Sequence, residues 1–194
     1  MLIIGVGSKA RQGKDTFCNA VVDHYENQRQ TAKRHDRISL APVAQNFKFA
    51  GVLYEVCQEL YGMKEKDGEL MQRVGTECRE KNPNHWIEKC FKKIDTSAVQ
   101  IALISDVRYK NEADFIKSRD GILVNVVRLN PDGSQFITGD RPADHPSEIE
   151  LDGYNWDYRI SAPSGQAGLI AELAITLTEY IRALDQSLKQ VAWG

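Results

Sequence analysis

Residues 1–16 read MLIIGVGSKARQGKDT, an apolar run followed at once by a polar loop with glycines at both ends. The run from Met1 to Val6 predicts a short buried strand, because unbroken apolar segments of this length suit a strand covered on both faces. From Lys14 to about Gln28, apolar residues recur at helical spacing. The stretch therefore predicts strand, loop and helix, an order in which loop amides and a helix N-terminus can together bind an anion.

The loop nearly matches G-x-x-x-x-G-K-[ST], the pattern of a phosphate-binding loop. Ser8 stands where the first glycine is expected, and Asp15 stands where a Ser or Thr normally contacts magnesium. We expect Lys14 to reach the β- and γ-phosphates of ATP as a mobile point charge. The residues predicted to bind the nucleotide here are Gly7, Ser8, Lys9, Ala10, Gly13, Lys14, Asp15 and Thr16.

Two other interpretations of the loop stay open. It could be an ordinary strand-to-helix turn in which Lys14 is a solvated residue of the first helical turn. Gly5 to Ala10 also fits G-x-G-x-x-A, the dinucleotide-binding fingerprint. That fingerprint needs an acid about 20 residues on, at the end of the next strand. Asp36 instead precedes the next candidate strand, which disfavours this interpretation.

The rest of the chain predicts further alternation of strands and helices. Strands are expected at 37–41, 99–105, 121–129 and 156–160, and helices at 43–61, 67–79, 84–94, 111–118 and 166–191. The first of these helices has four candidate core residues: Phe47, Val52, Val56 and Leu60. Such alternation predicts a single domain over 1–194 with a three-layer α/β fold and a parallel sheet.

Two long insertions stand out in this pattern. Residues 42–95 are too long for a simple crossover, so they predict a helical lobe that holds the acceptor substrate. Residues 131–146 contain two glycines and three prolines, which indicates a long loop. We therefore expect residues 130–150 to act as a lid.

A second acidic site follows the apolar run at 99–105. Asp106 comes directly after this predicted central strand, where a carboxylate can hold magnesium directly or through water. Asp15 and Asp106 are thus the candidate metal ligands. In the alternative interpretation, Asp106 caps the helix that begins near Asn111 or pairs with Arg108.

Phosphoryl transfer needs several positive charges, and the planar fork of arginine suits phosphate. Besides Lys14 and Asp106, the candidate catalytic residues are Arg11, Arg108 and Arg141, the last in the predicted lid. Each arginine could instead be a surface salt-bridge residue. Arg128, at the end of a predicted strand, is a candidate for nucleotide binding. The candidate residues for the substrate are Arg79, Trp86 and Glu148, although Trp86 could fill the lobe instead, and Ser147 could cap a short helix.

Composition narrows the class of protein. The 194 residues carry a net charge of −2, with 42% hydrophobic and 27% charged residues. The sequence has no basic stripe of the kind that binds a nucleic acid polymer, and no apolar run reaches the length of a membrane span. The four cysteines form no C-x-x-C pair, and no charged leader precedes the first strand. We therefore expect a cytoplasmic protein with reduced thiols.

Four segments together resemble a known family. They are residues 9–16, residues 72–79 with Trp86, residues 104–112, and residues 145–148 with Leu151, Asp152 and Asp157. In this order they resemble the phage-type deoxynucleoside monophosphate kinases and, more distantly, the animal-type phosphomevalonate kinases. The family usually carries a GKD-T loop, with which Asp15 and Thr16 agree.

The resemblance implies the fold of a nucleoside monophosphate kinase that uses ATP and Mg²⁺. It implies that Lys14 and its loop bind ATP, and that Arg11, Asp106 and Arg108 line the transfer site. By the same resemblance, residues 42–95 hold a deoxynucleoside monophosphate and the loop around Arg141 closes as a lid.

The sequence as a whole predicts ATP-dependent phosphorylation of nucleoside monophosphates to diphosphates. Two alternatives remain: a kinase of another small phosphorylated acceptor such as phosphomevalonate, and an ATP-binding module without transfer activity. The expected partner is a small-molecule substrate. A homodimer stays possible, with Tyr180 and Trp193 as either interface or core residues.

Overall fold

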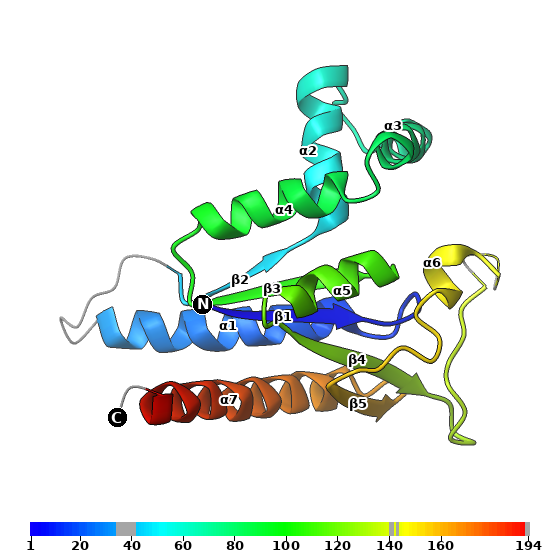
Figure 1. Ribbon diagram of the computed structural model, residues 1–194. Helices are drawn as coiled ribbons and strands as arrows, with labels where there is room; N and C mark the ends of the chain where they lie inside the picture. Colours follow the sequence, from blue (N-terminus) through cyan, green and yellow to red (C-terminus); the bar gives the residue numbers. More distant parts are fainter. Residues whose placement is uncertain (34–41, 140–141, 143, 193–194) are drawn as a thin grey trace.

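The computed structural model describes residues 1–33, 42–139, 142 and 144–192 of the chain. Within these residues it shows five strands and seven helices (Figure 1). Along the chain they are β1 (Leu2–Gly7), α1 (Lys14–Lys33), β2 (Ala44–Phe47), α2 (Phe49–Tyr61), α3 (Gly68–Lys81), α4 (His85–Thr96), β3 (Ile101–Val107), α5 (Lys110–Ser118), β4 (Ile122–Leu129), α6 (Pro146–Ile149), β5 (Tyr158–Pro163) and α7 (Ala167–Ala192).

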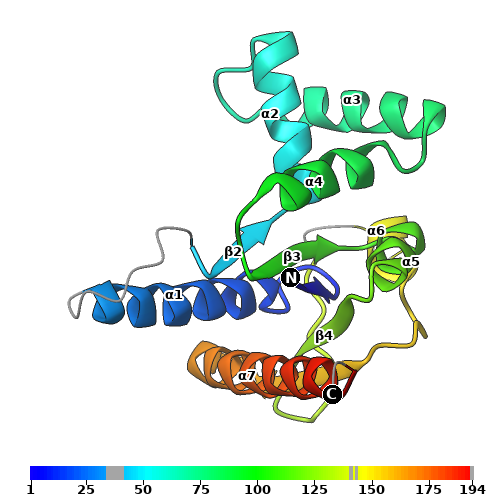
Figure 2. The same ribbon diagram turned by 60° about the vertical axis from the view of Figure 1, so that its left-hand side comes forward.

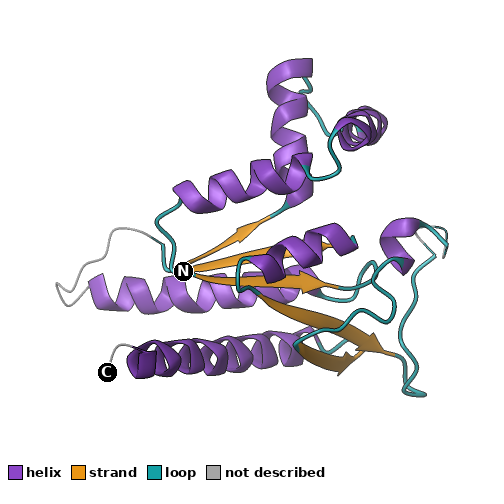
Figure 3. Cartoon of the chain, viewed as in Figure 1, coloured by secondary structure: helices purple, strands orange, loops and turns teal. Residues whose placement is uncertain are grey.

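The five strands form one sheet in the order β2-β3-β1-β4-β5, and all neighbouring pairs are parallel. From β1 the chain builds β2 and β3 on one side of the sheet, then crosses to build β4 and β5 on the other side. Open parallel sheets bind ligands outside the carboxyl ends of the strands, at the point where the strand order reverses. The loop between β1 and α1 lies at that point, and Figure 3 shows further loops gathered at the same edge.

Helices cover both faces of the sheet. α1 and α7 lie side by side against one face, and α5 with the lobe helices lies on the other (Figures 1 and 2). In β1, Ile4 and Val6 pack into the core with α1 and α7, whereas Ile3 packs into the core under the lobe. A strand that is buried on both faces needs apolar residues at every position, which explains the unbroken run. The arrangement agrees with the predicted three-layer α/β fold with a parallel sheet.

The helices α2, α3 and α4 form the lobe, which rises beyond β2 at the edge of the sheet (Figure 1). Trp86 on α4 is buried, and its Nε1 donates to the carbonyl of Gly75 on α3 at 3.2 Å. The carboxylate of Asp67 caps α3 by accepting the N–H groups of Glu69 and Leu70, each at 3.0 Å. The lobe is therefore packed by its own apolar and polar contacts.

Three sequence-based boundaries need correction or fall outside the described residues. The predicted helix at 43–61 is wrong at its start, because β2 occupies Ala44–Phe47 and α2 begins only at Phe49. Ala44 packs toward α1 and Phe47 toward the lobe, which is the alternation of a strand.

Leu60 is 76% exposed at the outer end of α2 and is not a core residue. The predicted strand at 37–41 lies outside the described residues, and the last strand begins at Tyr158, two residues later than predicted.

The structure also bears on several expectations that were drawn from composition. The four cysteines are free thiols. No helix within the described residues has both the length and the apolar character that crossing a membrane requires. Tyr180 on α7 is 54% exposed, which excludes a core role for it, and Trp193 lies outside the described residues.

Candidate functional site

The backbone of the loop between β1 and α1 takes an unusual path. Arg11 has a φ of 55° and Gly13 a φ of 104°, both in the left-handed region. A Cβ on Gly13 would lie 2.7 Å from Cδ1 of Ile170, whose side chain would have to shift, but the left-handed φ is the main reason that glycine suits this position. Left-handed residues in such a loop turn successive N–H groups toward one concavity, which is the geometry of an anion nest.

Lys14, the first residue of α1, folds back over this loop. Its Nζ donates to the carbonyls of Ser8 at 2.9 Å and Lys9 at 2.5 Å. The residue is only 7% exposed, so the alternative of a solvated Lys14 is wrong. Burial lowers the pKa of Lys14, and the nearby charge of Arg108 adds to this, against the opposing effect of Glu148; the resulting pKa is about 7. An ammonium group with few water contacts gains strongly from an incoming phosphate.

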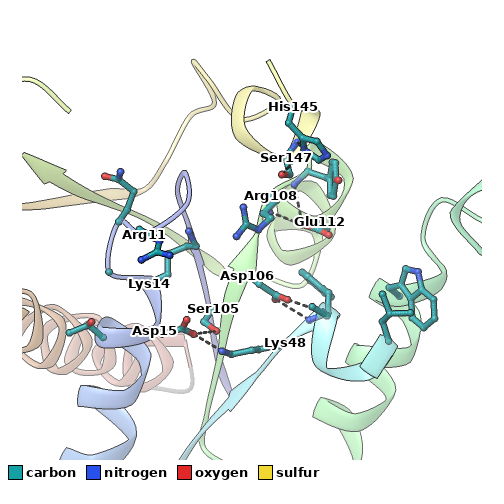
Figure 4. A pocket seen from close by; sticks show the side chains of 18 of the residues that line it. Arg11, Lys14, Asp15, Lys48, Ser105, Asp106, Arg108, Glu112, His145 and Ser147 are labelled. Carbon is teal, nitrogen blue, oxygen red and sulfur yellow. Dashed lines mark hydrogen bonds and ion pairs between the residues drawn. The ribbon is translucent and has the colours of Figure 1, made fainter. Parts of the chain in front are cut away.

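A cavity of about 630 Å³ extends from the loop to the lobe. Figure 4 shows side chains from the loop, the strand tips and the lobe pointing into it. Basic residues outnumber acidic ones in its wall. The basic residues are Arg11, Lys14, Lys48, Lys66, Arg79 and Arg108, and the acidic ones are Asp15, Asp106 and Glu112. Such a wall favours a ligand with several negative charges.

Asp15, one of the two predicted metal ligands, is bound by side chains. Its Oδ1 accepts from Nζ of Lys48 at 2.5 Å and from the hydroxyl of Ser105 at 3.2 Å. The side chain is 65% exposed. Burial alone would raise the pKa of Asp15, but the hydrogen bond and the charge of Lys48 outweigh it and lower the pKa. Asp15 is therefore ionised and accessible at the cavity wall.

Asp106, the other predicted metal ligand, is bound by the main chain. Its Oδ1 accepts from the N–H of Phe49 at 2.9 Å and its Oδ2 from the N–H of Ala50 at 2.8 Å. Burial raises the pKa of Asp106, although these two hydrogen bonds act against that rise. The alternative that Asp106 caps the helix near Asn111 is wrong, because it caps α2 instead.

Arg108 is held by two carboxylates, of which Figure 4 shows that of Glu112. Its backbone N–H donates to Oε2 of Glu112 at 2.7 Å, and its Nη1 donates to Oε1 of Glu148 at 2.9 Å. Glu112 also accepts from the N–H of Tyr109 at 3.1 Å, which completes the N-terminal cap of α5. Burial raises the pKa of Glu112 to about 8.

The lobe contributes the far wall of the cavity. Arg79 lies over the ring of Tyr109, with its Cζ 5.5 Å from the ring centroid. Trp86 reaches the cavity with one edge, but it is 3% exposed and its N–H is already bonded to Gly75. The structure therefore brings both predicted substrate residues of the lobe to the cavity, and it gives Trp86 a packing role there.

Other predicted residues lie away from this cavity wall. Arg128 stacks 4.1 Å from the ring centroid of Phe136, and its Nε donates to Ser164 at 2.9 Å. Ser8, Lys9 and Glu148 line a second cavity of about 550 Å³ instead. The remaining predicted residues outside the wall are Gly7, against which Trp156 packs, and Ala10. Arg141 lies outside the described residues.

Ser147 does not cap α6. The N-cap of α6 is His145, whose Nδ1 accepts from the N–H of Ser147. His145 and Ser147 both line the main cavity, next to Arg108. The segment before α6 thus closes one side of the site.

Several wall and support residues were missed from the sequence. Gln12 is completely buried; it donates to the carbonyl of Phe136 at 2.5 Å and accepts from the N–H of Arg128 at 2.7 Å, which braces the loop against β4. Lys48 follows β2 directly, so recognition of that strand would have indicated a cation at the ligand edge. Lys66 and Glu112 carried no comparable signal.

The main cavity is thus built from the loop, the tips of β2 and β3, the lobe and the segment before α6. The residues on its loop side are consecutive in sequence, while the opposite wall gathers residues from distant segments. The sequence matches no protein-family model and no curated protein.

Proposed function

We propose that this chain is a kinase that transfers the γ-phosphoryl group of ATP to a nucleoside monophosphate, with a deoxynucleotide as acceptor. The observation that carries the proposal is the buried Lys14, folded over a loop of left-handed residues at one end of a cationic cavity. The lobe forms the opposite end of the same cavity, so that two phosphorylated ligands can meet inside it.

The donor half of the site is the loop with α1. Residues 11–16 line the cavity, and the N–H groups of such a loop bind phosphate oxygens together with the helix N-terminus. Lys14 then exchanges its two carbonyl partners for β- and γ-phosphate oxygens. This exchange keeps its hydrogen bonds and adds a strong charge interaction.

The acceptor half is the wall of the lobe. Apolar and aromatic side chains there belong to Phe49, Leu53, Trp86 and Tyr109, while Arg79 and Lys66 supply positive charge. Flat apolar walls suit a base, and the two cations suit a single phosphate. A site for an isoprenoid acid phosphate would instead need a cluster of arginines for its separate carboxylate and phosphate. This composition supports a nucleotide over phosphomevalonate.

The two candidate metal ligands fit magnesium to different degrees. Mg²⁺ in phosphate sites takes one or two carboxylates and completes its shell with phosphates and water. Asp15 fits, because both of its hydrogen bonds go to Oδ1 from side chains that can move away. Asp106 would act through water, since each of its oxygens already accepts a backbone N–H. When bound, magnesium neutralises charge on the phosphate oxygens.

The protein's part in the reaction is positioning and charge stabilisation. The acceptor phosphate is already anionic, so no strong protein base is needed to activate it. Arg11, Lys14 and Arg108 surround the place where the transferred group would pass and stabilise its spread negative charge. In this proposal the loop around Arg141 closes the site against water, which would otherwise take the phosphoryl group. Both substrates are cytoplasmic metabolites, so the proposal implies a cytoplasmic protein.

The decisive experiment is an assay of acceptor-dependent ADP release with ATP, magnesium and a panel of nucleoside monophosphates, with phosphomevalonate included. We expect ADP release with one or more nucleoside monophosphates and faster release with deoxynucleotides than with ribonucleotides. Release with phosphomevalonate alone would establish the alternative acceptor. ATP binding without ADP release for any acceptor would contradict the kinase proposal and favour a binding module.

A further inference from the structure

Glu148 on α6 joins three segments that are far apart in the sequence. Its Oε1 accepts from Nη1 of Arg108 at 2.9 Å, and its Oε2 accepts from the N–H of Ala10 at 2.7 Å. Its backbone carbonyl accepts from Nζ of Lys9 at 2.6 Å. One residue thus connects α6 with the phosphate-binding loop and with the tip of β3.

The carboxylate lies on the far side of the loop from the main cavity. Residues 11–16 of the loop line the main cavity, whereas Glu148 lines the second cavity together with Ser8 and Lys9. Arg108 lines both cavities. Its guanidinium therefore stands between them, with Glu148 on one side and the predicted transfer site on the other.

This arrangement restricts Arg108 at both ends. Glu112 holds its backbone N–H, and Glu148 holds one of the five guanidinium N–H donors. The Glu148 side chain is only 9% exposed, and a buried bond between two charged groups is stronger and more directional than an exposed one. Without Glu148, the guanidinium is still attracted by the charge of Asp106, which lies two residues earlier near the end of β3.

We propose that Glu148 is a positioning residue: it aims the guanidinium of Arg108 at the transferring phosphoryl group and braces the loop at Ala10. This role differs from the substrate contact expected from the sequence. It rests on the proposed function, because it assumes that Arg108 meets phosphate in the main cavity. The larger part of the effect of Glu148 on phosphate must then pass through Arg108, while its bond to Ala10 and its charge near Lys14 account for the smaller remainder.

The test is a double-mutant cycle with Glu148→Ala, Arg108→Ala and the double variant. The first readout is the affinity for inorganic tripolyphosphate, measured by calorimetry, which does not require turnover. We expect Glu148→Ala to weaken binding about tenfold in the wild-type background and to change it less than twofold in the Arg108→Ala background. Equal losses in both backgrounds would overturn the proposal, since they would show that Glu148 acts without Arg108.

The second readout is steady-state kinetics with the best acceptor from the panel. Glu148→Ala should lower kcat by about 10- to 100-fold with little change in KM, because a small misplacement of a catalytic group acts mainly on the transition state. Glu148→Gln, which keeps an oxygen for the Ala10 N–H, should recover part of that loss. A raised KM with an unchanged kcat would instead indicate direct substrate contact and contradict positioning.

Asp152→Asn is the matched control. Asp152 lies in the same segment and pairs with Lys9, but it makes no contact with Arg108. It should leave both readouts within about twofold of wild type, as expected for an exposed pair. A coupled tripolyphosphate cycle in a protein that shows no ADP release with any acceptor would support the role of Glu148 while refuting the kinase function.

Discussion

Asp15 at the start of α1 and Asp106 at the tip of β3 face the same cavity, yet they are held in opposite ways. Within the described part of the chain, Asp15 accepts from side chains only, those of Lys48 and Ser105. Asp106 there accepts from backbone N–H groups only, those of Phe49 and Ala50 at the start of α2. The sequence suggested the same metal-binding role for both.

The difference separates a carboxylate that is available to a ligand from one that belongs to the fold. A lysine and a hydroxyl can rotate away when a metal or phosphate arrives, at a cost of about 1 kcal/mol or less for such an exposed pair. Backbone amides at a helix start cannot rotate away without unwinding the helix. The loop side of the cavity is therefore built for exchange of partners, and the tip of β3 is built to hold the lobe on the sheet.

The largest expected effect is at Lys14, on the loop side of the cavity. Lys14→Ala should lower acceptor-dependent ADP release by about 10³-fold, because one preorganised charge at the transferred phosphate is worth about 10²- to 10³-fold in rate. The fold should remain, since the hydrogen bonds of the amine to described residues lie within its own loop, at Ser8 and Lys9. Circular dichroism and ADP-release kinetics on the purified variant check both parts.

Lys9→Ala is the matched control for this prediction. Lys9 lies in the same loop, but its amine contacts Glu148 and Asp152 outside the main cavity. Its removal should lower the rate far less than removal of Lys14 does. Similar losses in the two variants would show that the loop responds to any lost lysine and that Lys14 has no special place at the phosphate.

The next effect contrasts the two carboxylates directly. Asp106→Ala leaves the first N–H groups of α2 without their partner, which costs about 1–2 kcal/mol of stability, or about tenfold in the folded-to-unfolded ratio. For a chain of this size, that lowers the midpoint of thermal unfolding by about 2–8 °C. Asp15→Ala should leave the midpoint nearly unchanged and weaken magnesium-dependent nucleotide binding instead.

Calorimetric melting and titration with Mg²⁺–ATP, applied to both variants, compare the stability and the nucleotide affinity of each. An unchanged melting temperature for Asp106→Ala would contradict the capping role of its carboxylate. If Asp15→Ala unfolded earlier and bound Mg²⁺–ATP normally, the two roles would be reversed. Asp106→Asn, which keeps one accepting oxygen, should fall between wild type and the alanine variant.

The same distinction explains what the sequence could predict. The strand, the loop and Lys14 were predictable because their signals are local: an apolar run, glycines at fixed positions and one lysine at a helix start. The backbone partner of Asp106 was not predictable, because the start of α2 lies 57 residues earlier in the chain. That start was also hidden, since Phe47 and Val52 read as one helical face although a strand ends between them.

Lys48 and Glu112 show the other limit. Lys48 became a candidate only once β2 was known to end beside it, and a four-residue strand has too few positions for its period to be recognised. The sequence places Glu112 near the start of a helix and gives no sign that it is buried. Only the folded chain buries it beside Arg108. The loop side of the cavity, whose signals are local, was thus predictable, and the wall assembled from distant segments was not.

The smallest expected effect concerns pH and again involves Lys14. Its pKa in the free protein is about 7, lowered by burial and by Arg108 and partly restored by Glu148, Asp15 and Asp106. A bound triphosphate favours the charged amine and raises that pKa, so binding takes up a proton above pH 7. Affinity should therefore be greatest below pH 7 and should fall as the pH rises, by about fivefold between pH 7 and pH 8.

Lys14→Met isolates this contribution, because it removes the titrating amine and leaves the rest of the wall. ATP itself titrates near neutral pH, and so does Glu112, whose pKa burial raises to about 8; both contributions are common to the two proteins. The ratio of wild-type to variant affinity, measured by calorimetry from pH 7 to pH 9, should therefore decline as pH rises. A ratio that stays constant would mean that the amine is already fully charged in the free protein. The exchange of the carbonyl partners of Lys14 for phosphate oxygens would then gain no free energy from protonation. The loop side of the cavity would differ from the tip of β3 as a ligand site in geometry alone.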